Sequence, residues 1–244
     1  MTPRTKEQNE EIRLRRLAQI RKAAADVFLN KGPLLEIRDV AAQAELGYGT
    51  VYHYYSNKGD LLHDLLWDAL ERAGRWLEAP LEVPSALASG QAPADGHWGY
   101  AAEAFTGNSA DADSRSESRQ TAAAAKLGPT AAAGVRLMQL WADDHALYLL
   151  HKLAGESFSW LPEARSAPLA AAFRREVLTP LVVLLENEHA ADGAAASGVN
   201  TAEPPYWLQC AEMLLAALVG CASLSLRRGK LHEEAMDIAR FLKL

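Results

Sequence analysis

Apolar residues recur every three or four positions from residue 10 to about residue 77, a pattern that predicts a series of amphipathic helices. The segment before them, residues 1–9, is polar and is expected to be disordered. Gly32 and Pro33 end the first helix, because glycine is a frequent helix stop and proline cannot continue a helix. Asn57 can cap the fourth helix, with Asp60 in the capping-box position. The predicted helices cover residues 10–30, 37–44, 48–55 and about 58–77.

The rest of the chain shows longer helical patterns between segments rich in small and polar residues. Residues 79–96 are rich in Pro, Ala, Ser and Gly and predict a linker or a loop. Pro180 falls inside one helical pattern and predicts a kink there. No segment alternates apolar and polar residues between turn signals, so the sequence predicts an all-α protein. The long patterns cover residues 130–154, 165–190 and 204–228, and a final helix is expected from residue 231 to the end.

The second and third predicted helices are short and about three residues apart, which is the geometry of a helix-turn-helix. In this motif the second of the two helices enters the major groove of DNA. The first predicted helix supplies the apolar support that two short helices lack on their own. The sequence therefore predicts a helix-turn-helix DNA-binding domain at residues 1–60, ordered from about residue 10, and a helical effector-binding and dimerisation domain at residues 61–244.

Charge is distributed unevenly along the chain. The net charge of −6 by itself argues against nucleic acid as a partner. Residues 1–62, however, hold 10 Lys or Arg and 8 Asp or Glu, a net charge of +2, whereas the remainder holds 15 and 23, a net charge of −8. A mildly basic N-terminal domain followed by an acidic remainder, called the body below, is typical of a DNA-binding protein with a separate sensing domain.

Four short runs of the N-terminal domain carry a signature: Ile37–Ala44, Gly49–Tyr55, Asn57-Lys58 and Leu61-Leu62. Together they resemble the TetR family of bacterial repressors, over about residues 12–66. The run of aromatic residues around Tyr52 is the most specific part, because a generic helix-turn-helix does not need it. Glu45 stands where the family usually has a turn glycine, and Gly47 where it often has a serine cap. Glycine is a tolerable N-cap, so the turn is expected to form.

Eight residues are expected to contact DNA. Thr50 and Tyr52 can donate hydroxyls to phosphates, which positions the protein without specifying a sequence. Tyr48, His53 and Tyr54 are better placed for base edges. The expected DNA-binding residues are Arg38, Tyr48, Gly49, Thr50, Tyr52, His53, Tyr54 and Lys58.

The remaining positions of this surface have separate roles. Gly49 lets the helix approach DNA closely, and Lys58 can contact a phosphate at a helix N-terminus. Arg38 can bind a guanine through two hydrogen bonds, as the matching position often does in the resembled family, or can instead pair with Glu36 or Asp39. Val51 and Tyr55 are expected in the core, and His53 has a solvated surface position as its alternative. The N-terminal cations are as consistent with a solvated tail as with DNA contact: Arg4, Lys6, Arg13, Arg15 and Arg16.

Palindromic DNA requires a two-fold symmetric protein, so a homodimer is expected. The resemblance implies that it forms through a four-helix bundle of the two penultimate helices of each subunit. Cys210 and Cys221 are about 16 Å apart along one helix, too far to pair within it, and are expected to be inert buried thiols. The expected interface residues are Leu178, Leu181, Val182, Leu185, Leu214 and Leu218.

The resemblance also implies an effector pocket in the body, where most aromatic residues of the chain lie. Aromatic lining would suit an apolar or aromatic small molecule, although part of this set is expected to fill core. Asp144, His145 and His151 do not share a helix face, so no metal or other cofactor is expected. The expected pocket residues are Trp98, Phe105, Trp141, His145, Tyr148 and Trp207.

The sequence therefore predicts a cytoplasmic DNA-binding regulator, expected to be a repressor that a small ligand releases from a palindromic operator. An activator or a ligand-independent DNA-binding protein of the same fold are the alternatives. An enzyme is not expected, because the chain lacks a Gly-rich phosphate loop, a nucleophile elbow and a metal signature. No membrane contact is expected either, since Gly220 and Ser223 interrupt the longest apolar run, which predicts a buried helix.

Overall fold

The computed structural model of the chain describes residues 5–74, 76, 128–193 and 204–244. Within these ranges every regular element is helical, which confirms the predicted all-α class. The predicted linker at 79–96 and two expected pocket residues, Trp98 and Phe105, lie outside the described residues. The described α-helices are α1 (Lys6–Lys31), α2 (Ile37–Gln43), α3 (Tyr48–Tyr54), α4 (Lys58–Ala73), α7 (Pro129–Asp143), α8 (His145–Gly155), α9 (Glu163–Phe173), α10 (Thr179–Gly193), α11 (Pro204–Arg227) and α12 (Leu231–Phe241).

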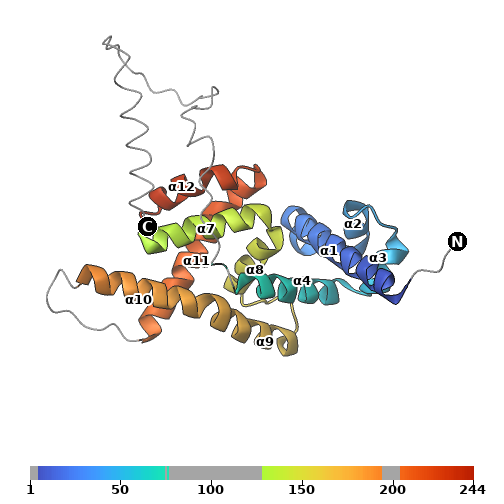
Figure 1. Cartoon of the computed structure of the whole chain (residues 1–244), viewed down its shortest axis with the longest axis horizontal. Coiled ribbons are helices and arrows are strands. Elements are labelled where there is room, and N and C mark those ends of the chain that lie inside the picture. Colours follow the sequence, from blue (N-terminus) through green and yellow to red (C-terminus); the bar gives the residue numbers. More distant parts are fainter. Residues whose placement is uncertain (1–4, 75, 77–127, 194–203) are drawn as a thin grey trace, which may run out of the picture.

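The helices form an N-terminal head and a larger body. The head consists of α1, α2 and α3 at one end of an elongated molecule, and α4 runs from it into the body (Figure 1). In the body, α7 and α12 lie together on one side, α9 and α10 on the other, and α8 and α11 between them. One continuous core of buried apolar residues joins head and body.

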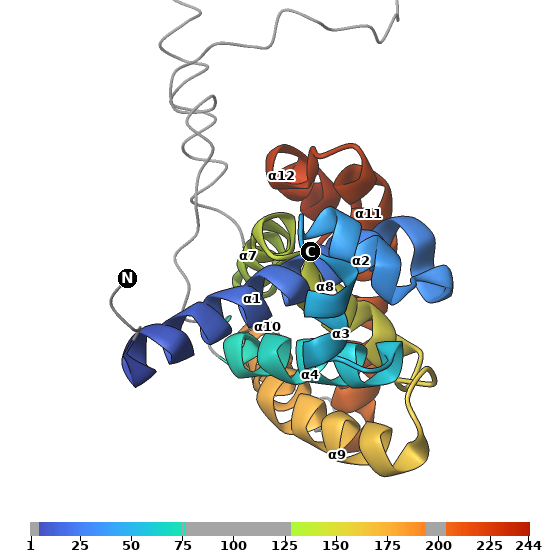
Figure 2. The same cartoon turned by 90° about the vertical axis from the view of Figure 1, so that its right-hand side faces the viewer.

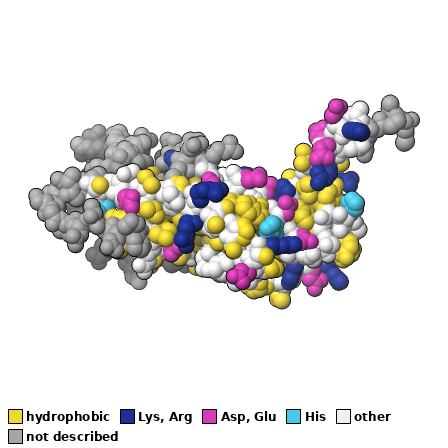
Figure 3. Space-filling view, turned by 90° about the horizontal axis from the view of Figure 1, so that it is seen from below, with side chains coloured by type: hydrophobic (Ala, Val, Ile, Leu, Met, Phe, Trp, Pro, Cys, Tyr) yellow, Lys and Arg dark blue, Asp and Glu magenta, His cyan; other side chains and the backbone are white. Residues whose placement is uncertain are grey.

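Helix α1 begins earlier than the sequence predicts, because Thr5 and Gln8 form a capping box. The Thr5 hydroxyl accepts the Gln8 backbone N–H at 3.3 Å, and the Gln8 side chain accepts the Thr5 backbone N–H at 3.1 Å. The expected disorder up to residue 9 is therefore wrong for residues 5–9. From Thr5 to Arg16 all side chains except Ile12 are exposed, and this end of α1 projects from the rest of the molecule (Figures 2 and 3).

The turn between α2 and α3 has the geometry expected of a helix-turn-helix. Glu45 has a φ of 54°, so a glutamate occupies the left-handed conformation that glycine adopts most easily. The Leu46 backbone N–H donates to the Ala41 carbonyl at 2.9 Å and closes the end of α2. Helix α1 supports the turn through the Gln19 amide, which donates to the Ala44 carbonyl at 2.6 Å.

Two predicted body helices are interrupted in the structure. The helix expected at 130–154 divides into α7 and α8 because the Asp144 carboxylate caps α8, accepting the Ala146 N–H at 3.0 Å. The helix expected at 165–190 passes through a π-helical turn, Arg174–Leu178, between α9 and α10. This turn lies just before Pro180, whose missing N–H interrupts the α-helical hydrogen bonding, so the predicted distortion takes the form of a π-helical turn.

Helix α11 is buried on one face only, which corrects the expectation of a buried helix. By length and composition alone, the segment Tyr206–Arg227 is long and apolar enough to cross a membrane. Only 28% of its most apolar stretch of 18 residues is buried in the protomer. The buried face carries Ala211, Leu215, Leu218 and Ala222. The exposed face carries a stripe at helical spacing: Tyr206, Gln209, Met213, Ala216, Gly220 and Leu224.

Candidate nucleic-acid interface and adjoining cavity

Helix α3 presents two large aromatic side chains to solvent. Tyr48 and Tyr52 are 53% and 51% exposed, and their rings stack with centroids 5.7 Å apart. Gly49 and His53 are also exposed, whereas Thr50 and Tyr54 are half-buried. The exposed rings bury little apolar surface within the protomer, so packing inside the chain does not explain them.

The opposite face of α3 holds the helix in place. Val51 and Tyr55 are buried, which confirms their predicted core positions. The Tyr55 hydroxyl donates to Asp64 of α4, and Arg21 of α1 binds the same carboxylate at 2.8 Å. Burial and the bond to Asp64 both raise the pKa of Tyr55. Burial raises the pKa of Asp64, but hydrogen bonds from Arg21 and Tyr55 outweigh it and hold that pKa below its ordinary value. Sequence reasoning missed this network, because its members come from three helices.

Gly49 leaves open space above α3. Apart from its two chain neighbours and the nearby backbone of α3, a Cβ atom built at this position would meet no atom within 4 Å. Glycine is a weaker helix former than alanine, and no contact within the chain requires this residue to lack a side chain. An alanine at this position would therefore fit the protomer as well as the glycine does.

The two expected DNA-binding cations have partners within the chain. Arg38 is 78% exposed at its side chain and forms an ion pair with Glu36 at 3.1 Å, one of the alternatives expected for it. Lys58 donates from Nζ to the Pro33 carbonyl at 2.9 Å, so it ties the start of α4 to the segment after α1. Both side chains are at the surface, where such interactions exchange readily.

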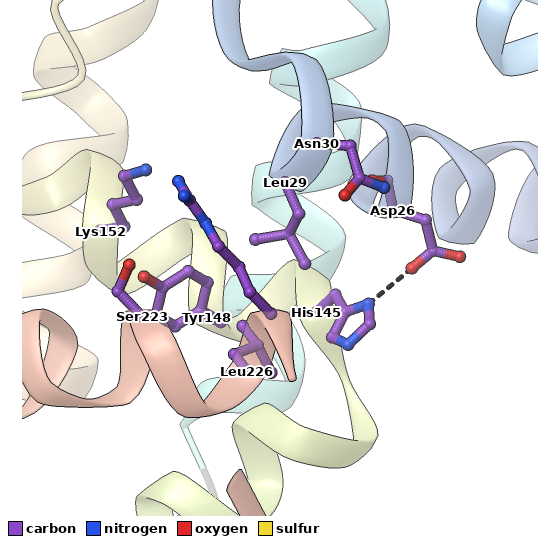
Figure 4. Close-up of a pocket in the computed structure, with 9 residues that line it drawn as sticks. Asp26, Leu29, Asn30, His145, Tyr148, Lys152, Ser223 and Leu226 are labelled. Carbon is purple, nitrogen blue, oxygen red and sulfur yellow. Dashed lines mark hydrogen bonds and ion pairs between the residues drawn. The ribbon is translucent and has the colours of Figure 1, made fainter. Parts of the chain in front are cut away.

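A cavity of about 250 Å³ lies where the head meets the body, between α1, α8 and α11 (Figure 4). Of the expected pocket residues, His145 and Tyr148 line it. The Asp26 carboxylate of α1 lies 2.6 Å from His145 Nδ1 of α8, which joins the head to the body at the rim. Sequence reasoning missed the other lining residues, which are Asp26, Leu29, Asn30, Lys152, Ser223, Leu226 and Arg227.

The other described aromatic candidates lie elsewhere. Trp141 is fully buried and packs edge-on against Tyr148 and His151, so it is a core residue in this structure. Burial lowers the pKa of His151 to about 4, which keeps this imidazole neutral. Trp207 does not line the cavity, and its ring is tilted by 58° against that of His189 of α10, with centroids 5.2 Å apart.

The expected dimer residues divide into two groups. Leu178, Leu181 and Leu218 are buried within the protomer, where a partner could not contact them. Val182, Leu185 and Leu214 are half-buried, and the exposed apolar residues near them on α10 and α11 are Val183, Met213 and Leu224. Cys210 and Cys221 are both partly exposed, so neither is the fully buried thiol expected. Among the described residues no group of three or more His, Cys, Asp or Glu could hold a metal ion.

Residues 20–65 match the family model described as bacterial regulatory proteins, tetR family. This segment begins within α1, ends within α4 and includes both helices of the helix-turn-helix. No curated protein matches the chain.

Similar solved structures cover most of the chain at low identity. GusR of Salmonella enterica is 15% identical over 94% of both chains, with a TM-score of 0.47. A gamma-butyrolactone receptor (ArpA-like protein) is 16% identical over 94% of this chain and 96% of that one, with a TM-score of 0.46. The transcriptional regulator FadR of Bacillus subtilis, solved with stearoyl-CoA, is 16% identical over 92% of this chain and 96% of that one, with a TM-score of 0.47.

Proposed function

We propose that the chain is a homodimeric transcriptional repressor of the TetR family, because residues 20–65, which contain both helices of the helix-turn-helix, match the model of bacterial regulatory proteins, tetR family. In this proposal residues 1–60 bind a palindromic operator, and residues 61–244 form the dimer and bind a small-molecule effector. The observation that carries the proposal is the exposed face of α3, with its stacked tyrosines and open glycine.

The exposed face of α3, together with Arg38 and Lys58, is called the reading surface, because in this proposal it recognises the operator. It makes contacts of two kinds. Tyr48, His53 and Tyr54 face base edges, while the hydroxyls of Thr50 and Tyr52 bind phosphates. On binding DNA, Arg38 leaves its exposed ion pair with Glu36 and binds a guanine, and Lys58 adds a phosphate contact. The exposed N-terminal part of α1, which holds Lys6 and Arg13, extends the surface toward the DNA backbone.

The exposed stripe of α11 supports dimerisation. Met213 and Leu224 are 64% and 68% exposed, and Ala216 and Gly220 lie between them on the same face. A Cβ built at Gly220 would meet nothing within 4 Å, so close packing within the protomer does not require this glycine. A two-fold interface on this stripe buries it and holds the reading helices about 34–36 Å apart, one turn of DNA.

Helix α4 is the element through which an effector would act. Arg21 of α1 binds its Asp64 and Asp68 at 2.8 and 2.7 Å on the head side. Two further ion pairs join α4 to the body. Its Arg72 binds Asp144 at 2.8 Å, and its Asp60 binds Arg165 of α9 at 2.6 Å. A ligand that binds the two orientations of α4 with different affinity changes the spacing of the reading helices and releases the operator.

DNA binding is tested by selecting bound sequences from a random duplex library and measuring their affinity by fluorescence anisotropy. We expect a palindrome. Gly49→Ala is expected to leave the melting temperature unchanged or raised but to weaken operator binding, because the new methyl group enters the space above α3. Gly155→Ala, at an equally open glycine of α8, is the matched control. Equal operator affinity for both variants would contradict the reading surface, and so would the absence of any selected sequence.

The oligomeric state is tested by sedimentation at micromolar concentration. The wild type is expected to be a dimer, and Met213→Glu with Leu224→Glu is expected to give a folded monomer, because both side chains are exposed in the protomer. Leu14→Glu, at an exposed leucine of α1, serves as the control. A monomeric wild type, or co-flotation of wild type with lipid vesicles through the α11 stripe, would contradict the proposed dimer.

Repression is read from a reporter placed behind the selected operator.

A further inference from the structure

The cavity between α1, α8 and α11 carries more positive than negative charge. Lys152 of α8 and Arg227 of α11 line it, and Asp26 is the one carboxylate among its described lining residues. Asp26 is already engaged, with Oδ1 2.6 Å from His145 Nδ1. Asp26 therefore contacts the imidazole and forms no ion pair with Lys152 or Arg227.

Within the described part of the chain, no carboxylate lies within 4.0 Å of the side-chain nitrogens of Lys152 or Arg227. This is a contrast with the neighbouring arginines, since Arg228 binds Glu234 at 2.7 Å and Arg72 binds Asp144 at 2.8 Å. Two cations that line one cavity repel each other when neither forms an ion pair. An anion placed between them relieves that repulsion and gains charge-assisted hydrogen bonds.

The size and walls of the cavity narrow the ligand further. Its volume of about 250 Å³ is roughly eight times the 30 Å³ that one water occupies in the liquid, which suits a small molecule. Leu29 and Leu226 provide apolar walls, and Asn30 and Ser223 add polar groups (Figure 4). We propose that this cavity binds a small organic anion, whose carboxylate or phosphate group contacts Lys152 and Arg227 and whose short apolar part lies against Leu29 and Leu226.

The position of the cavity connects such a ligand to DNA binding, and this part of the inference rests on the proposed function. Asn30 belongs to α1 of the head, whereas Lys152 and Arg227 belong to α8 and α11 of the body. An anion that contacts all three helices stabilises one orientation of the head on the body. The affinity for the operator then changes by the ratio of the ligand's affinities for the DNA-bound and free orientations.

Calorimetric titration of the full chain at low ionic strength tests the site with benzoate, inorganic phosphate and benzylamine. Benzoate and benzylamine share a ring and differ in the sign of charge. We expect saturable binding of benzoate with a dissociation constant on the order of 1 mM or below, and none of benzylamine. Tighter binding of phosphate than of benzoate would identify the anion as a phosphate, and the reverse order as a carboxylate.

Matched variants separate the site from the overall charge of the protein. Lys152→Gln with Arg227→Gln is expected to weaken anion binding at least about tenfold. Arg174→Gln with Lys230→Gln removes the same charge from exposed positions outside the cavity and is expected to have no effect. Equal binding by both double variants, or no saturable binding of either anion, would overturn the proposed site.

The regulatory step is tested separately, by measuring operator affinity with and without the saturating anion. We expect a change that the Lys152→Gln, Arg227→Gln variant abolishes. Unchanged operator affinity with intact anion binding would overturn the coupling. A chain that binds the anion but selects no DNA sequence would overturn the proposed function and leave the anion site standing.

Discussion

Glu45 lies in the turn between α2 and α3 with a φ of 54°, in the left-handed region. Side chains with a Cβ enter this region at a cost of about 1–2 kcal/mol, because the Cβ crowds the following carbonyl. Glycine avoids that cost but loses about 0.5–1 kcal/mol more conformational entropy on folding. We therefore expect Glu45→Gly to stabilise the protein by about 0.5–1 kcal/mol.

The other interactions of Glu45 do not offset this gain. Its side chain is exposed, and its backbone N–H donates to the Ala42 carbonyl at 3.1 Å, a bond that glycine retains. Urea unfolding at fixed protein concentration measures the change as a higher midpoint with an unchanged slope. The melting temperature is expected to rise by about 1–4 °C in a chain of this size.

Two control variants test the physical reason. Glu45→Gln removes the charge and keeps the left-handed side chain, so it is expected to leave stability unchanged. Ala42→Gly places a glycine at an exposed position of α2 and is expected to destabilise by about 1 kcal/mol. The reasoning is refuted if Glu45→Gly lowers the midpoint, or if Glu45→Gln raises it equally, since the charge would then be the cause.

Three further predictions concern how the helices are joined. Asp144→Ala removes the cap of α8 and the ion pair with Arg72, and is expected to cost about 1–2 kcal/mol in urea unfolding; Asp144→Asn, which keeps a capping oxygen, should cost less. Tyr55→Phe removes the hydroxyl bonded to Asp64 and is expected to lower the free energy of unfolding by about 1 kcal/mol; no change would mean that the bond contributes nothing net. Burial lowers the pKa of His151 from 6.5 to about 4. As the pH falls, the imidazole is therefore protonated in the unfolded chain before it is protonated in the folded one. The free energy of unfolding should therefore fall between pH 6.5 and 4, by up to about 3 kcal/mol, and His151→Gln should flatten that profile; an unchanged profile would exclude this imidazole as the cause.

The head was largely predictable from the sequence because its determinants are local. The apolar spacing around Val51 and Tyr55 predicts which face of α3 is buried, and the structure confirms it. Asn57 caps α4 through a 2.9 Å bond to the Asp60 N–H, as its position predicts. Two boundaries were wrong there. The capping box of Thr5 extends α1 into a polar segment, and α4 ends at Ala73 rather than near residue 77.

The body was less predictable, because its interruptions depend on single polar contacts. Asp144 lies within a continuous apolar pattern, and nothing in that pattern indicates that its carboxylate caps a new helix. Leu178, Leu181 and Leu218 fall on the same apolar stripes as their half-buried neighbours, so periodicity alone does not separate the protomer core from a dimer surface. That separation depends on which side of each helix another helix covers.

The sequence by itself determined the all-α class, the place and buried face of α3 and the family resemblance, since periodicity, caps and turn residues act within a few positions of one another. The tertiary structure alone decided where the cavity lies and what charge lines it. Asp26, Lys152 and Arg227 are separated by more than seventy residues from one to the next, and no local pattern connects them. They share one cavity because α1, α8 and α11 pack together, and only that packing places two cations beside a carboxylate already bound to His145.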